Sequence, residues 1–105
     1  MRVETIRRLT IDEFCQEFER EVVVRERSGK DFPIGSPLRF YACFEPSANC
    51  KDDGLLRGTM GNGITVNAAI ADLGREFSEE RIILDAYTEA RREVGPFVFV
   101  DGDTQ

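Results

Sequence analysis

The 105-residue chain contains no histidine and no tryptophan. Without histidine, the protein has neither Ser-His-Asp nor Cys-His catalysis, and no metal can bind through imidazole. There is no run of about 18 apolar residues, so the sequence predicts no transmembrane helix. Residues 1–10 alternate arginine with apolar residues and lack a continuous apolar region, which indicates no secretory signal.

Cysteine is scarce, with three residues: Cys15, Cys43 and Cys50. An odd number without C-x-x-C spacing argues against both a disulfide framework and a zinc knuckle. The pattern favours small buried hydrophobes in a reducing cytoplasm. A Cys43–Cys50 bridge across a hairpin and a reactive thiol are the open alternatives.

Basic residues are outnumbered, with 14 Lys+Arg against 20 Asp+Glu and a net charge of −6. Because 41% of the residues are hydrophobic and both signs of charge occur, the composition is that of a folded domain. We expect a single α+β domain over residues 1–100 and a flexible tail over 101–105. No basic face is apparent, which argues against direct nucleic-acid binding.

The clearest local signal lies at residues 10–21. Thr10 and Glu13 have the spacing of a helix capping box, and the apolar residues that follow lie on one helical face. The opposite face carries Asp12, Glu13, Glu17 and Glu19. Residues 10–21 hold five acidic residues and one basic residue. A plain solubilising face and a docking face for a basic partner are both compatible with this pattern.

The remaining pattern predicts a sheet and a second helix. Expected strands are Glu21–Arg27, Leu38–Glu45, Leu55–Met60, Arg81–Tyr87 and a short Phe97–Val100; the expected helix is Thr65–Phe77. Residues 28–37 and 46–54 are expected to be loops, and 88–93 a charged turn or short helix. The resulting order is α-β-β-β-α-β: a two-layer domain whose antiparallel sheet carries both helices on one face. The expected core is Phe14, Phe18, Val22, Phe40, Phe44, Ile70, Leu73, Phe77, Ile82 and Leu84.

Three other groups of residues are candidates for chemistry. Gly58, Gly61 and Gly63 lie between a strand and a helix, but the G-x-x-G-x-G spacing differs from that of a dinucleotide-binding turn. A turn with positive φ and close helix packing is the alternative. The pairs Asp52–Asp53 and Asp101–Asp103 are expected to be solvated. Asp85 and Tyr87, near Arg91 and Arg92, fit either a small polar site or, more simply, a structural ion pair.

Two resemblances bear on function. The segment from Leu38–Glu45 through Leu55–Met60, a glycine turn, and a helix with Thr65 and Ala69 resembles the core of HicB antitoxins. That resemblance implies an antitoxin or a regulatory partner protein, although no C-terminal DNA-binding segment follows Tyr87. Residues 37–93 are also similar to small uncharacterised bacteriophage and prophage proteins, in the runs Leu38–Glu45, Gly61-Asn62-Gly63 and Asp85–Thr88. This second resemblance implies expression in a bacterial host cytoplasm.

Together these features predict a small, acidic, non-catalytic protein-binding module of phage origin without cofactor or metal. We expect it to bind a bacterial host protein, one with a basic nucleic-acid-binding surface being a candidate, through Asp12, Glu13, Glu17 and Glu19. Inhibition of that host protein, as by anti-CRISPR proteins, is left open. So is a homodimer. The alternative is a HicB-like antitoxin or regulatory partner.

Overall fold

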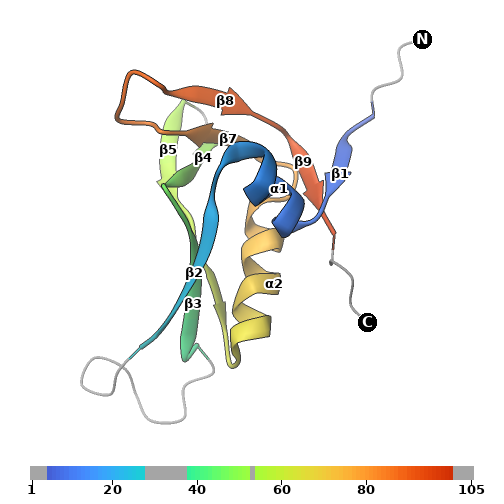
Figure 1. The fold of residues 1–105 in the computed structure, drawn as a ribbon, viewed down its shortest axis with the longest axis vertical. Coiled ribbons are helices and arrows are strands. Elements are labelled where there is room, and N and C mark those ends of the chain that lie inside the picture. The colour runs from blue at the N-terminus through green and yellow to red at the C-terminus, as the bar shows by residue number, and fades with distance from the viewer. Residues whose placement is uncertain (1–4, 28–37, 53, 101–105) are drawn as a thin grey trace.

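The computed structural model describes residues 5–27, 38–52 and 54–100, and these form two helices and nine short strands (Figure 1). The expected loop at 28–37, the second residue of the Asp52–Asp53 pair, and the expected tail with Asp101 and Asp103 lie outside the described residues. The mixed content confirms the α+β class. No helix within the described ranges is long and apolar enough to cross a membrane.

The elements follow one another as β1 (Arg7–Leu9), α1 (Ile11–Phe18), β2 (Glu21–Glu26), β3 (Phe40–Glu45), β4 (Ala48–Asp52), β5 (Leu55–Gly58), β6 (Gly61–Gly63), α2 (Val66–Phe77), β7 (Arg81–Leu84), β8 (Arg92–Val94) and β9 (Phe97–Phe99). They form a three-stranded sheet β2-β3-β6, a four-stranded sheet β5-β4-β7-β8, and a pair β1-β9. The larger sheets are antiparallel throughout, whereas β1 and β9 are parallel.

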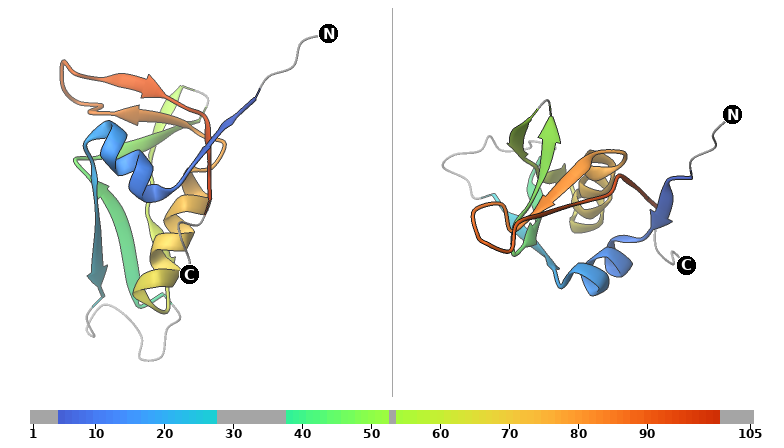
Figure 2. Two further views of the ribbon diagram at one scale, coloured as in Figure 1. Left: turned by 45° about the vertical axis from the view of Figure 1, so that its right-hand side comes forward. Right: turned by 90° about the horizontal axis from the view of Figure 1, so that it is seen from above.

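Both helices begin at the expected threonines. Thr10 and Glu13 form the complete capping box of α1, and the Thr65 hydroxyl accepts a hydrogen bond from Ala68 N at the start of α2. The ring of Phe44 on β3 lies 5.0 Å from Phe14 of α1 and 5.2 Å from Phe77 of α2. Both helices therefore pack on the same face of β3, as predicted (Figure 2).

The segment after β3 was expected to be a polar loop, and this expectation is wrong. Residues 48–52 form β4, which pairs with both β5 and β7. Ala48 and Cys50 are buried, and they alternate with the half-buried Asn49 and Lys51. The strand has the period of two typical of a sheet, but its inward residues are small, so the hydrophobic signal is weak.

Two further segments differ from expectation: the chain after Leu84, and residues 7–9. The strand beginning at Arg81 stops at Leu84, because Asp85 adopts a left-handed backbone with φ 52°. The turn expected in the charged segment 88–93 is present, with Thr88 N donating to Asp85 O and Arg91 N to Thr88 O. The segment contains no helix, and its last residues enter β8. Residues 7–9 add a parallel strand beside β9; three residues are too few to show a period in the sequence.

Seven of the ten expected core residues are buried, namely Phe14, Phe18, Phe44, Leu73, Phe77, Ile82 and Leu84. Val22, Phe40 and Ile70 are only partly buried and pack against that core. The buried set also includes Leu9 and Phe97, which lie in or beside the short parallel pair. The edge position of β2 explains why Val22 keeps contact with solvent.

The glycine cluster is explained by packing. A Cβ atom on Gly61 or Gly63 would come closer than 3.0 Å to backbone atoms of α2, which real Cβ atoms essentially never do. Positive φ angles occur among the described glycines at Gly54 and Gly95, not at the cluster, so the expected positive-φ turn there is wrong. Gly61 and Gly63 let α2 lie directly against β6.

Candidate partner-binding surface

The four acidic residues predicted for partner binding all lie exposed on or directly after α1. On the opposite side of the helix, Phe14 and Phe18 are buried in the core. Phe14 alone contacts Phe44, Phe97 and Phe99 with ring centroids 5.0–6.1 Å apart. This packing fixes the direction in which the acidic side chains point, which is toward solvent.

Glu17 is held by an arginine from the neighbouring strand. Arg7 Nη1 donates to Glu17 Oε2 at 2.8 Å, and Arg7 Nη2 donates to Oε1. This bidentate hydrogen bonding holds the pKa of Glu17 below its ordinary value of 4.5, and the same contact raises the pKa of Arg7. Arg7 therefore offsets part of the negative charge that the sequence places on this face.

Glu13 has a structural contact as well. Its side-chain Oε1 accepts a hydrogen bond from Thr10 N at 2.8 Å, and Glu13 N donates to Thr10 Oγ1 at 3.1 Å. These bonds satisfy two backbone N–H groups at the start of α1, those of Thr10 and Glu13. Because the carboxylate stays exposed, it still contributes negative charge to the surface.

Asp12 and Glu19 are different. Both are exposed, and neither side chain makes a hydrogen bond or ion pair within the described ranges of the chain. Glu19 ends α1 in a left-handed conformation with φ 56°. Asp12 and Glu19 therefore differ from Glu13, which caps the helix, and from Glu17, which pairs with Arg7.

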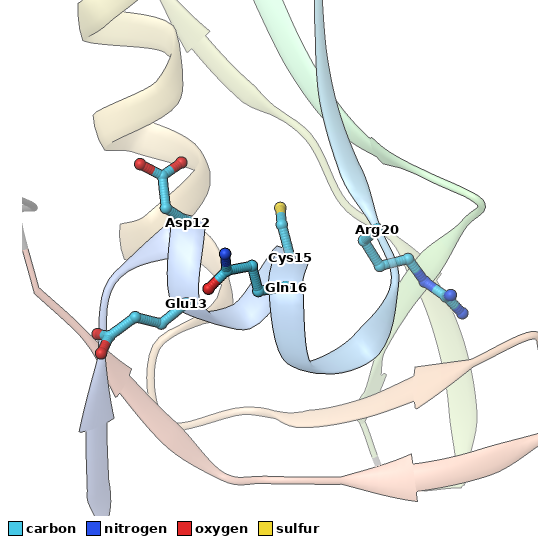
Figure 3. Close-up of a pocket in the computed structure, with 5 residues that line it drawn as sticks. All are labelled: Asp12, Glu13, Cys15, Gln16 and Arg20. Carbon is cyan, nitrogen blue, oxygen red and sulfur yellow. The ribbon is translucent and has the colours of Figure 1, made fainter.

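A shallow hollow of about 450 Å³ lies along α1 and is lined by Asp12, Glu13, Cys15, Gln16 and Arg20. Figure 3 shows that these side chains do not converge: Asp12 and Cys15 point to one side, Glu13 points away from them, and the Arg20 guanidinium is directed elsewhere. Burial, with a smaller contribution from Asp12, raises the pKa of Cys15 to about 11, so its thiol is protonated at neutral pH.

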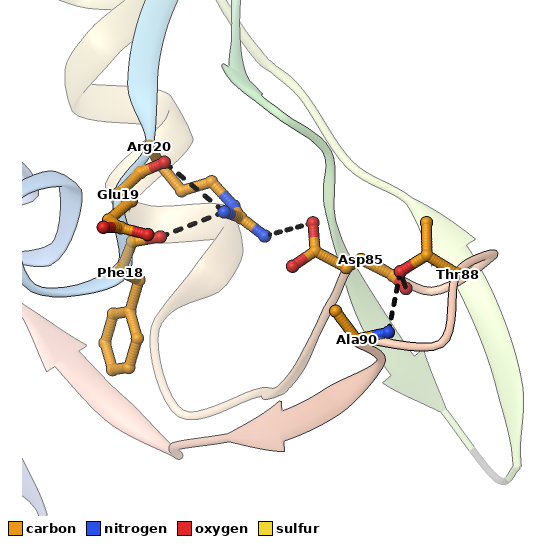
Figure 4. A network of polar contacts seen from close by, with 6 residues as sticks. All are labelled: Phe18, Glu19, Arg20, Asp85, Thr88 and Ala90. Carbon is orange, nitrogen blue, oxygen red and sulfur yellow. Dashed lines mark hydrogen bonds and ion pairs between the residues drawn. The ribbon is translucent and has the colours of Figure 1, made fainter.

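Sequence reasoning missed the contact that fixes the end of α1. Arg20 has a side chain only 4% exposed, and its Nη2 lies 2.8 Å from Asp85 Oδ1. Arg20 Nη1 also donates to Phe18 O at 3.0 Å (Figure 4). Asp85 was expected to form an ion pair with Arg91 or Arg92; the ion pair exists, but the partner is Arg20. The two residues are 65 positions apart, so no local signal in the sequence indicates their contact.

The remaining candidate groups are the three cysteines, the carboxylates and Tyr87. Cys15, Cys43 and Cys50 form no disulfide in the structure, so the Cys43–Cys50 bridge is absent. In the part of the chain that the structure describes, no three Cys, Asp or Glu side chains gather in a way that could hold a metal ion. Tyr87 is 85% exposed.

Comparisons with protein-family models, with curated proteins and with solved structures found no match for this chain. The class defined by the structure is an α+β protein with an exposed acidic helix. Function is therefore argued from that surface, because an architecture of this kind does not by itself specify an activity.

Proposed function

We propose that the protein is a small non-catalytic binding module of phage origin that docks on a basic surface of a bacterial host protein through Asp12, Glu13, Glu17 and Glu19. The observation that carries this proposal is the exposure of Asp12 and Glu19 without any hydrogen bond or ion pair in the described ranges. Carboxylates held on a rigid helix speed association with a basic partner and favour its orientation.

The other two carboxylates fit the same role. Glu17 is paired with Arg7, but both side chains are about half exposed, at 40% and 52%. Exposed ion pairs contribute little to stability, so a partner's arginine can replace Arg7 at small cost. Where the basic surface of the host protein normally binds nucleic acid, docking of α1 would block that surface and inhibit the protein.

Non-catalytic function and a cytoplasmic location belong to the same proposal. The side chains around the hollow at α1 do not converge on a common point, and the Cys15 thiol is held protonated. The three cysteines form no disulfide, which is consistent with a reducing compartment.

The proposal is tested by capturing host proteins on the immobilised chain and comparing charge variants. In D12K/E19K, the two carboxylates without partners are reversed while the Arg7–Glu17 pair and the capping box stay intact. The matched control E79K/E89K makes the same change of net charge at two exposed residues outside α1. We expect the captured protein to be lost with D12K/E19K and kept with the control, and wild-type binding to weaken with salt.

Equal capture by D12K/E19K and wild type, with both folded by circular dichroism, would place the contact elsewhere and refute the proposal. Neutral variants refine the result. D12N/E19Q keeps the shapes of both side chains, so a loss of affinity there reflects charge rather than the bulk of lysine.

A HicB-like antitoxin is the second candidate. It is favoured by the way Gly61 and Gly63 admit α2 against β6, with Thr65 capping the helix and Ala69 fully buried. These are the positions that carry the resemblance in the sequence. If this candidate is right, co-expression of the chain with a small toxin encoded beside it should protect the cell.

A further inference from the structure

Strand β2 forms an open edge of the three-stranded sheet. Its one partner among the described strands is β3, and Figure 2 (left) shows β2 at the margin of the molecule. Arg27 N donates to Arg39 O, and these residues continue the β2–β3 register. Since the direction of backbone groups alternates along a strand, Glu21, Val23 and Arg25 bond toward β3. The N–H and C=O groups of Val22 and Val24 therefore point outward.

Within residues 5–27, 38–52 and 54–100, this edge has none of the proline, lysine or bulge features that commonly block pairing. Glu21–Glu26 contains neither proline nor lysine, and its six residues pair with β3 in unbroken register, without a bulge. Natural edge strands of this length are normally blocked by such features or covered by another element. A second strand can therefore add to β2 without distortion of the sheet.

The sequence of β2 is complementary to itself. Glu21 and Arg25 lie at equal distances on either side of Val23, and three valines occupy the centre. In an antiparallel pair with a two-fold axis at Val23, Glu21 of each copy lies opposite Arg25 of the other. These are non-hydrogen-bonded pairs, in which opposing side chains approach most closely. Val22 and Val24 supply the hydrogen bonds between the two copies.

An unfavourable contact within the chain would be relieved by the same pairing. Glu21 lies directly opposite Glu45 on β3, so two like charges face each other across the sheet. Arg25 reaches Glu45 at 2.9 Å, whereas Glu21 makes no ion pair within the described residues. A guanidinium from a second copy would supply the missing positive charge beside Glu21.

We propose that β2 is a self-association surface, at which two copies of this chain pair antiparallel about Val23 and join two three-stranded sheets into one six-stranded sheet. The partner strand is a second copy of β2 for two reasons. The opposite charges of Glu21 and Arg25 lie symmetrically about Val23, and so do the outward-pointing backbone groups of Val22 and Val24. This proposal does not depend on the proposed host partner, which docks on the outer face of α1.

The first test is sedimentation velocity of the full chain over a range of concentrations. We expect a monomer–dimer equilibrium in the wild type that V24P abolishes, because proline removes the outward N–H of Val24 and leaves the β2–β3 hydrogen bonds intact. Hydrogen exchange adds a second readout: protection of the Val22 and Val24 amides should rise with concentration. A strictly monomeric wild type up to about 1 mM would refute the proposal.

The second test separates association from folding and does not rely on proline. E21R places arginine opposite Glu45 and should stabilise the fold, yet it brings two arginines together in each dimer contact. We expect E21R to weaken association about tenfold while it raises the melting temperature. The double variant E21R/R25E restores opposite charges between copies and should recover the dimer. Failure of the double variant to recover it would overturn the two-fold axis at Val23.

Discussion

Arg20 Nη2 and Asp85 Oδ1 lie 2.8 Å apart, and this ion pair joins the start of β2 to the turn that follows β7. The same guanidinium donates to the carbonyl of Phe18 at the end of α1. Its Nε has no hydrogen-bond partner in the described structure. One buried cation therefore fixes the position of the acidic helix relative to the rest of the domain, and most of its compensation comes from Asp85.

Removing the charge of Asp85 should therefore cost more than removing Arg20. D85N keeps a residue that tolerates the left-handed backbone, but it leaves the guanidinium buried without a counter-charge. We expect a loss of about 2 kcal/mol in the free energy of unfolding for D85N, and a smaller loss for R20M. Urea denaturation of both variants and of the double variant measures the coupling. If the two single losses simply add in the double variant, the pair is not coupled.

Glu19 offers a stabilising change on the proposed binding surface. Its left-handed backbone, with φ 56°, is strained for residues with a Cβ atom and relaxed for glycine. E19G should stabilise the protein by about 0.5–1 kcal/mol, whereas E19A keeps the strain and should have little effect. Thermal unfolding compares the two. Since both variants remove the same charge, any equal effect on partner binding reports the carboxylate rather than stability.

Gly61 and Gly58 form a matched pair for testing the helix–strand contact. The Cβ atom of G61A would overlap backbone atoms of Ala69 and Leu73, and backbone cannot move aside as a side chain can. We expect G61A to cost about 3 kcal/mol or to prevent folding. A Cβ atom on Gly58 meets nothing within 4 Å, so G58A should be neutral or slightly stabilising. Similar stabilities for the two variants would contradict the packing explanation.

The sequence predicted what depends on local pattern. The capping box at Thr10, the two amphipathic helices and the burial of alternate residues in β3 were all apparent from spacing of residues within a few positions. The strands that were missed or shortened are those without a strong local pattern. β4 turns small residues inward, and β1 has three residues and depends on β9, about 90 positions later.

The candidate surface was predictable in position but not in charge. Exposure of the acidic residues follows from the apolar stripe on the other side of α1. The pairing of Glu17 does not follow from it, because Arg7 reaches Glu17 from a separate strand. The pairing of Arg20, the one basic residue of segment 10–21, with Asp85 in a distant turn is equally invisible in the sequence. Charge counted along a segment differs from charge on the folded surface whenever such pairs form.

Phe44 and Phe40 test the depth of the core along one strand. Both lie on the inner face of β3, but Phe44 is 4% exposed and contacts both helices, while Phe40 is only partly buried. F44A should lose about 3–5 kcal/mol, and F40A about half as much, as measured by chemical denaturation. A larger loss of unfolding free energy for F40A than for F44A would contradict this difference in burial between the start of β3 and its other end.

The Arg7–Glu17 pair predicts a specific dependence on pH. Because Arg7 holds the pKa of Glu17 below 4.5 in the folded protein, the pair stabilises the fold above that pH. This contribution should disappear as the pH falls through the folded-state pKa, where the carboxylate is protonated in both states.

Carbon NMR titration of Glu17 should therefore give a midpoint below 4.5 in the wild type and a midpoint closer to 4.5 in R7Q. R8Q, at the exposed neighbouring arginine, is the matched control and should leave the midpoint low. A Glu17 midpoint unchanged by R7Q would show that the pair does not persist in solution, and the full negative charge of α1 would then face the partner.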